Sequence, residues 1–206
     1  MPIAIDNPKE NQMTRAITLA LMTLMIMGCE STTTHTQYYQ LADEPATATV
    51  QEGAKRVVIE PVSLVDFLKR PNILLKQENN TLYVTNYHVW AEPLDKAIAR
   101  AMVNRINQRG SELRAGQARF SQCLDSQCVS LKLMVEGFYP TDQSSVIFSG
   151  KYQLKQGTHL LSQQDFSLAK DLASDGYPHA VEQLKQLVYQ LSSQIEQEVT
   201  SKLVDK

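Results

Sequence analysis

The three cysteines have the most distinctive chemistry in this chain, and Cys29 directly follows an uncharged apolar run, residues 16–28. As a helix, thirteen residues reach about 20 Å, well short of the roughly 30 Å hydrocarbon core of a bilayer. A buried amphipathic helix also fits poorly, because the run is apolar on every face. Lys9 and Arg15 supply a basic segment ahead of it. We therefore predict a secretory signal peptide over residues 1–28, with Met1 and Met13 both open as the start.

The end of the apolar run is more specific than an ordinary signal peptide. Ile26, Gly28 and Cys29 stand at the positions of a bacterial lipobox: a branched aliphatic residue, a small residue and the cysteine. In that class the thiol receives diacylglycerol, the chain is cut before the cysteine, and the new amine is acylated, as with palmitate. Each buried methylene contributes about 0.8 kcal/mol, so two or three chains anchor a protein stably. We predict lipidation of Cys29 and no other cofactor; the alternative is a chance cysteine after an ordinary signal.

The other two cysteines, Cys123 and Cys128, would then lie in an oxidising compartment. The loop between them is short, and Asp125 and Ser126 suit a turn. We predict a disulfide. The alternatives are a redox pair or half of a metal site, but the sequence holds no Cys-x-x-Cys, and its histidines are scattered at positions 35, 88, 159 and 179. No metal site is predicted.

Motifs of the common catalytic sites are not found. The sequence holds no Gly-x-Ser-x-Gly nucleophile turn, no glycine-rich phosphate loop and no His-Glu-x-x-His pair. The formal net charge of −2 argues against a nucleic-acid partner, which would require clustered Lys and Arg. These observations favour a protein that is not an enzyme.

One further segment, residues 87–94, combines aromatic, charged and proline residues and holds the only tryptophan, Trp90. Trp90 has two interpretations. It could pack between a strand and the following helix, or it could anchor a partner, because Trp, Tyr and Arg dominate interface hot spots. On the second interpretation the candidate partner-binding residues are Tyr87, Trp90, Glu92 and the upstream Arg70.

The pattern along the chain predicts the elements that would position these residues. After the lipidated cysteine and a short tether (29–36), which reaches about 23 Å when extended, residues 37–206 read as one domain. Strands are predicted at 37–41, 56–62, 73–76, 81–85, 129–136, 145–154 and 158–168. Residues 111–122 read as a loop that could end in a short strand.

Two helices are predicted. The first begins at Pro93 and ends before Gly110, and the second runs from Tyr177 to about Leu203 with apolar residues three and four apart. The long apolar stripe favours core packing over a coiled-coil partner site. The order of strands, helix, strands and helix predicts a single α/β domain with a mixed, mainly antiparallel sheet and covering helices.

Several of these segments together resemble the PqiC/YmbA lipoproteins, the auxiliary lipoproteins of MCE-type intermembrane transport systems. The segments are 38–41 (YYQL), 59–62 (IEPV), 68–71 (LKRP), 87–94 (YHVWAEPL), 98–100 (IAR) and 177–178 (YP). The resemblance covers about residues 29–204. The Cys123/Cys128 pair is a departure from it.

The resemblance implies a three-layer α/β domain without catalytic residues, held at the outer membrane by its lipid and facing the periplasm. It implies docking to an MCE-domain tunnel protein that carries lipids or other hydrophobic molecules and supports membrane integrity, and it implies assembly as a homo-oligomeric ring. The competing hypothesis is a structural outer-membrane or cell-envelope lipoprotein without a transport role.

Overall fold

The computed structural model describes residues 35–42, 55–108, 113–121, 123 and 127–204. All but His35 of these belong to one compact unit, Thr36–Lys206. Cys29, the predicted signal peptide and most of the predicted tether lie outside the described residues. No helix among the described residues is long and apolar enough to cross a membrane.

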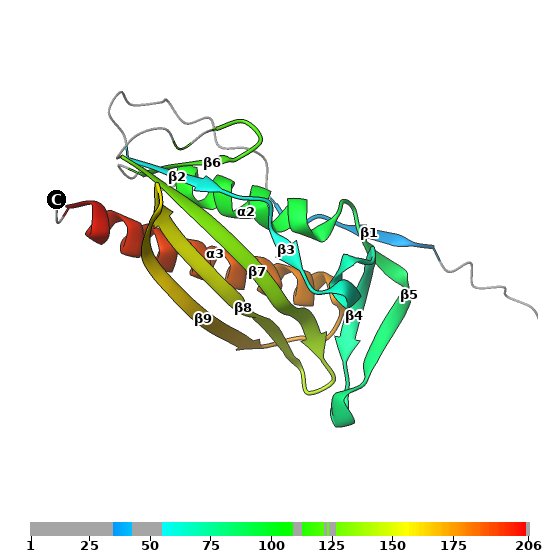
Figure 1. The fold of residues 1–206 in the computed structure, drawn as a ribbon. Coiled ribbons are helices and arrows are strands. Elements are labelled where there is room, and N and C mark those ends of the chain that lie inside the picture. Colours follow the sequence, from blue (N-terminus) through cyan, green and yellow to red (C-terminus); the bar gives the residue numbers. More distant parts are fainter. Residues whose placement is uncertain (1–34, 43–54, 109–112, 122, 124–126, 205–206) are drawn as a thin grey trace, which may run out of the picture. The chain divides into compact units, whose positions relative to one another are not determined.

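The sheet of this unit is organised around one long strand, β7 (Cys128–Thr141). One edge of β7 pairs along its length with the antiparallel β8 (Ser145–Gln156), which pairs with the antiparallel edge strand β9 (His159–Asp171). The other edge of β7 is shared by short parallel strands: β2 (Lys55–Ile59), β3 (Ser63–Leu64) and the end of β4 (Asn72–Lys76). The sheet therefore branches on this side, as Figure 1 shows.

One branch continues from β2 to the parallel strand β6 (Leu113–Gln117), and the other from β4 to β5 (Leu82–Trp90) and β1 (Gln37–Tyr39). Strands β4 and β5 form a hairpin whose tip is the short 3-10 helix η2 (Glu78–Asn80). Asn79 and Asn80 have φ angles of 59° and 62° there, a left-handed conformation that Asn tolerates better than most residues. A second 3-10 helix, η1 (Asp66–Lys69), links β3 to β4.

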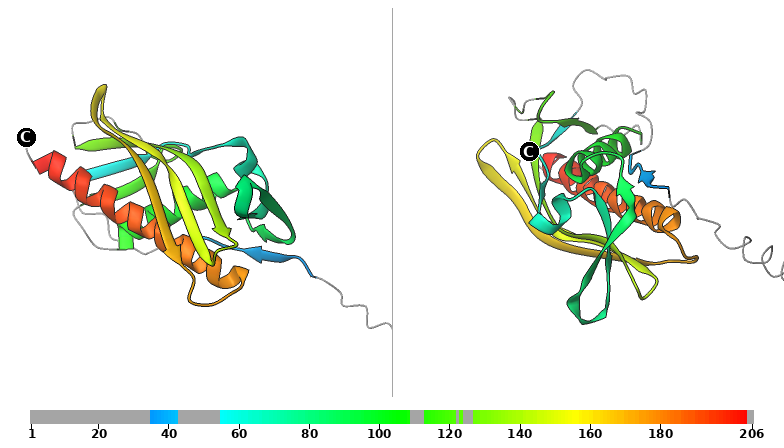
Figure 2. Two further views of the ribbon diagram at one scale, coloured as in Figure 1. Left: turned by 90° about the horizontal axis from the view of Figure 1, so that it is seen from below. Right: turned by 90° about the vertical axis from the view of Figure 1, so that its right-hand side faces the viewer.

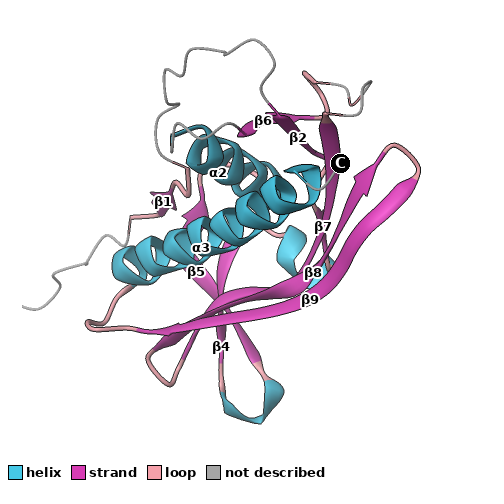
Figure 3. Cartoon of the chain, turned by 90° about the vertical axis from the view of Figure 1, so that its left-hand side faces the viewer, coloured by secondary structure: helices cyan, strands magenta, loops and turns pink. Residues whose placement is uncertain are grey.

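Two α-helices, α2 (Leu94–Gln108) and α3 (Tyr177–Val204), pack against each other and lie on the concave side of the curved sheet (Figures 2 and 3). Alternate residues of β7 face them: Val129, Leu131, Leu133 and Val135 are fully buried. Each α3 residue predicted for the apolar stripe from Val181 to Val199 is also buried. These residues form one continuous core.

The opposite face of the long strands is much more open. Lys132, Met134 and Glu136 of β7 are exposed, and Lys151 of β8 pairs with Glu136 at 2.8 Å. Near the start of β7, Val58 and Cys128 on this same face are buried but do not belong to the helix-covered core. Ser121, from the loop after β6, lies against Gly116 of β6 there, where a Cβ would meet its hydroxyl. Among the described residues the third layer implied by the resemblance is therefore limited to this loop.

The predicted class, a mixed α/β domain with two helices, is confirmed. The antiparallel pairs carry the long ladders, and the parallel pairs are short. Two strands are much longer than predicted: β5 continues to Trp90 and β7 continues to Thr141. The strand predicted at 56–62 ends at Ile59. The pairing register shifts in both of the longer strands. In β7 the shift lies between Val135 and Gly137, and in β5 it lies between Val84 and Val89, which pair with Leu74 and Asn72 of β4. A bulge interrupts the two-residue alternation that reveals a strand in the sequence.

Candidate functional site

The predicted partner-binding residues meet at one corner of the unit, where β5 ends and α2 begins. The Trp90 amide donates a hydrogen bond of 2.7 Å to the Pro71 carbonyl. This bond places Arg70 beside the end of β5, and Glu92 follows two residues after Trp90. The tertiary structure therefore brings Arg70, Tyr87, Trp90 and Glu92 to the same region, although Arg70 is distant from the others in the sequence.

Their side chains differ in what they can do. Trp90 is only 5% exposed, and its ring lies 5.7 Å from that of Phe138 in the core. Its burial favours the packing interpretation of the two that the sequence left open. Tyr87 is 44% exposed and Arg70 is exposed, so both can meet a partner. Glu92 is half-buried and forms an ion pair with Arg100 of α2.

The surface beside this corner is hollowed. A hollow of about 280 Å³ is lined by Val62, Ser63, Leu64, Lys69, Pro93, Leu94 and Asp95. A smaller one of about 50 Å³ adjoins it and shares Val62 and Asp95, adding Glu60, Lys96 and Arg119 among others. We call the two together the corner groove. Its lining mixes apolar residues with charges of both signs, which suits a polypeptide partner better than a single charged ligand.

The corner groove unites four segments that are separate in the sequence. Residues 59–64 supply the end of β2 and strand β3, Lys69 belongs to η1, residues 93–99 begin α2, and residues 117–119 follow from β6. The first three adjoin or overlap motifs through which the chain resembles the lipoprotein family, namely 59–62, 68–71 and 87–94. No periodicity or spacing could have identified this groove, because it exists only where β2, β3 and α2 meet.

A second feature that the sequence prediction missed is a group of aromatic rings on β1, β5 and the start of α3. The Tyr39 hydroxyl lies 2.8 Å from Nδ1 of His88, and the His88 ring stacks on Tyr177 at 4.0 Å between centroids. Burial lowers the pKa of His88. Burial also raises the pKa of Tyr177, and the hydroxyls of Tyr83 and Tyr39 raise this pKa further.

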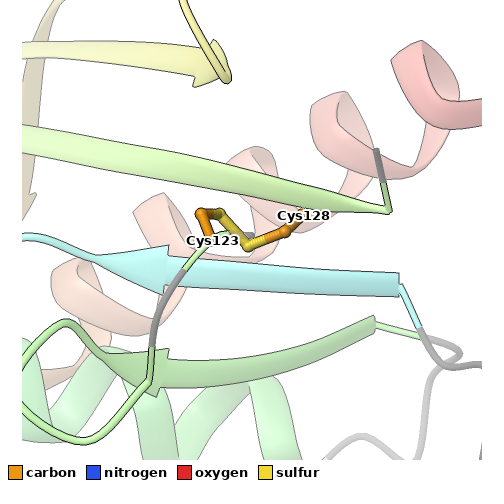
Figure 4. Close-up of a disulfide and its surroundings, with 2 residues drawn as sticks. All are labelled: Cys123 and Cys128. Atoms are coloured by element: carbon orange, nitrogen blue, oxygen red, sulfur yellow. A yellow bond between two sulfur atoms is a disulfide. The ribbon is translucent and has the colours of Figure 1, made fainter. Parts of the chain in front are cut away.

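Cys123 and Cys128 form the predicted disulfide, with their Cα atoms 5.2 Å apart (Figure 4). Cys128 begins β7 and is fully buried, and its backbone pairs in register with Arg56 of β2. The bond therefore attaches the loop after β6 to the first residue of the central strand.

No group of three or more His, Cys, Asp or Glu side chains arranged to hold a metal ion occurs in the part of the chain that the structure describes. Glu198 of α3 connects this helix to the sheet through hydrogen bonds. It accepts hydrogen bonds from the Tyr152 hydroxyl at 2.7 Å and from the Gln164 amide at 3.4 Å. Burial and this carboxylate together raise the pKa of Tyr152 strongly. The arrangement ties α3 to β8 and β9, which is a structural role.

Comparisons with known proteins agree with this fold and identify the class of protein. The family model described as "ABC-type transport auxiliary lipoprotein component" matches residues 39–196. The chain belongs to this family of transport-associated lipoproteins, which is not an enzyme family. A search of curated proteins found no match.

Two solved structures share the fold. One, of an uncharacterized protein, is 25% identical with a TM-score of 0.68, and the match covers 80% of this chain and 99% of that one. The other is protein XCC0632 from Xanthomonas campestris, described under the family DUF330. It is 13% identical with a TM-score of 0.63, and the match covers 82% of this chain and 99% of that one. The second likeness concerns the fold alone.

Proposed function

We propose that this chain is the outer-membrane lipoprotein subunit of an MCE-type intermembrane transport system. In this role it faces the periplasm and docks an MCE-domain tunnel protein, which carries lipids or other hydrophobic molecules, to the outer membrane. The observation that carries the proposal is the family match over residues 39–196. The lipobox at Cys29 supplies the anchor.

The surface that we assign to docking is the corner groove together with Arg70 and Tyr87. The groove supports the proposal because it is hollowed and of mixed charge, and because the exposed Arg70 follows Lys69 of its lining. Tyr87 is added because it is exposed, and Tyr and Arg are residue types that dominate interface hot spots. Trp90 contributes by packing on Phe138 in the core just before α2 begins, so that it supports this corner from within.

Anchoring and docking are tested separately. For the anchor, a Cys29→Ser variant should leave the outer-membrane fraction, because without a thiol no lipid can be attached. If this variant still fractionates with the outer membrane, the lipidation assignment is wrong.

For docking, the lipidated protein should recover an MCE-domain protein from solubilised envelopes. Arg70→Glu and Tyr87→Ala should each reduce that recovery, while Lys132→Glu on the exposed outer face of β7 should not. Lys132→Glu is a matched control for Arg70→Glu, since both reverse one exposed charge. If the unchanged protein recovers only structural envelope proteins, the alternative of a lipoprotein without a transport role is favoured. Equal loss with all three variants would refute the assignment of the surface.

A further inference from the structure

The strand β9 has a free edge along its whole length. Among the described residues β9 pairs with β8 alone, and Figures 1 and 3 show it at the rim of the sheet. In an antiparallel pair, every second residue directs its N–H and C=O groups away from the partner strand. About half of the 13 residues of β9 therefore present backbone donors and acceptors on a side where no other described strand pairs with them.

The middle of this edge lacks the usual protection. Natural proteins protect exposed edge strands with proline, with lysine or with a bulge, because an open edge accepts another extended chain. Residues 162–169 (SQQDFSLA) hold no proline, lysine or arginine, and their only charged side chain is that of Asp165. The register shift between β8 and β9 lies before this stretch, between Leu160 and Ser162. The stretch is therefore open to an added strand.

The surface beside the edge is hollowed on the helix-covered side of the sheet. The hollow measures about 840 Å³ and lies between residues 164–168 of β9 and polar residues in the C-terminal half of α3: Gln194, Gln197, Glu198, Ser201 and Lys202. The Tyr152 hydroxyl and the Gln164 amide donate hydrogen bonds to Glu198, which hold α3 against the sheet here. The hollow leaves room for the side chains of a further strand.

The apolar core is incomplete at the same place. Phe166 and Leu168 pair in register with Gly150 and Phe148 of β8, which are buried, but are themselves only half-buried. The Phe166 ring packs edge-to-face on that of Phe148 with centroids 4.9 Å apart, and both Phe166 and Leu168 border the hollow. Apolar side chains of an added strand would remove the remaining surface of these two residues from water, which is favourable.

On the other side of the sheet, a row of charges ends at this edge. The Lys151 ammonium of β8 lies 2.8 Å from the Glu136 carboxylate of β7, and Lys151 pairs in register with Asp165 of β9. Glu136, and to a smaller extent Asp165, raise the pKa of Lys151. One lysine therefore serves two carboxylates, of which Asp165 is the outer one. A Lys or Arg opposite Asp165 on an added strand would balance the row.

We propose that the free edge of β9 binds an extended segment of a partner polypeptide, which adds a strand to the sheet by β-augmentation. The segment places a Lys or Arg opposite Asp165 and apolar residues opposite Phe166 and Leu168. Such alternation is required because neighbouring residues of a strand face opposite sides of the sheet.

This edge is separate from the corner groove. Strands β2 and β3 of the groove pair with one edge of β7, whereas β8 and then β9 continue from the other. The inference therefore depends neither on the lipid anchor nor on the docking surface assigned above.

The test uses the complete chain in detergent micelles and a capped, fluorescent synthetic peptide. The peptide alternates valine with threonine and carries one lysine in place of a threonine, so that valines can cover the hollow while lysine meets Asp165. Binding is measured by fluorescence anisotropy, with protein-free micelles as the background. Two further peptides carry N-methyl groups on alternate amides, one on the valines and the other on the remaining residues.

Strand pairing uses only one of these two sets of amides. We therefore expect one methylated peptide to bind like the unmethylated one and the other to bind at least about ten-fold more weakly. No binding of the unmethylated peptide would overturn the inference, and so would equal effects of the two methylation patterns.

A charge reversal tests the predicted lysine contact. Asp165→Lys should weaken binding of the lysine peptide by about five-fold or more, and a peptide with glutamate in place of lysine should restore it. Asp171→Lys is the matched control, because Asp171 is also exposed and lies on the same face of β9 but beyond the hollow. Both sites are exposed, so neither change should unfold the protein. Equal weakening by the two variants would refute the assigned register.

Sedimentation of the protein without peptide examines the competing occupant. If the protein forms an oligomer that Asp165→Lys dissociates, a second copy of the chain occupies the edge, and the inference of a partner segment is overturned.

Discussion

Replacement of Trp90 by alanine tests most directly whether this residue is part of the core or an anchor for a partner. Trp90 is 5% exposed and packs on Phe138, which itself packs edge-to-face on Phe148 with ring centroids 5.3 Å apart. Removing a large buried aromatic side chain typically costs about 3–5 kcal/mol, because the cavity collapses only in part. Against a total stability on the order of 5–15 kcal/mol this is a severe loss.

We therefore expect Trp90→Ala to lower the midpoint of thermal unfolding by about 6–20 °C, since 1 kcal/mol corresponds to about 2–4 °C in a domain of this size. The matched control is Tyr87→Ala, three residues earlier in the same strand. Tyr87 is 44% exposed, so its loss should change stability by no more than about 0.5 kcal/mol. Calorimetry or circular dichroism of the three proteins measures both changes.

The refuting result is clear. If Trp90→Ala unfolds at the same temperature as the unsubstituted protein while recovery of the MCE-domain partner falls, Trp90 is an exposed anchor in solution and the packing described above is not the relevant one. A Trp90→Phe variant keeps an aromatic contact with Phe138. Docking that is retained in Trp90→Phe and lost in Tyr87→Ala would assign binding to Tyr87.

Three further predictions follow from other parts of the fold. Reduction of the Cys123–Cys128 disulfide should lower the free energy of unfolding by about 2 kcal/mol, which is the chain-entropy value for a six-residue loop. Identical denaturation midpoints with and without reductant would contradict this prediction. Gly150→Ala should lower the free energy of unfolding by about 2 kcal/mol or more, because a Cβ at Gly150 would collide with the backbone carbonyl of Met134 beside the bulge in β7. If the variant is as stable in denaturant as the unsubstituted protein, this strand pairing is not rigid. Burial lowers the pKa of His88 from 6.5. As the pH falls, the unfolded state therefore takes up a proton before the folded state does, and the free energy of unfolding should decrease slightly below about pH 6.5. An NMR titration that gives the folded imidazole a pKa at or above 6.5 would reverse that expectation.

Local patterns identified most of the elements because most elements here have a regular apolar period. The alternation from Val129 to Val135 predicts a half-buried strand, and the stripe from Val181 to Val199 predicts the long helix, and both are confirmed. The pattern fails where the backbone is irregular. The bulge between Val135 and Gly137 shifts the alternation by one residue, so Phe138 faces the core although it is three residues after Val135.

Residues 113–117 show a second limit of local patterns. They read as polar loop, yet they form β6, because the neighbouring strand β2 supplies backbone hydrogen bonds along its whole length. Pairing with a distant strand can override a weak local preference, and such a strand is not visible in the sequence alone.

The sequence by itself determined what is encoded by adjacent residues: the predicted signal and lipobox ending at Cys29, the short loop that allows Cys123 and Cys128 to pair, and the periods of the two helices and the main strands. Only the tertiary structure decided what depends on long-range pairing. It buried Trp90 against Phe138, assembled the corner groove from four separated segments, and brought the rings of Tyr39, His88 and Tyr177 together from β1, β5 and α3. The physical reason is that periodicity records which face of an element is apolar, whereas the surfaces between elements depend on which strands pair and in which register.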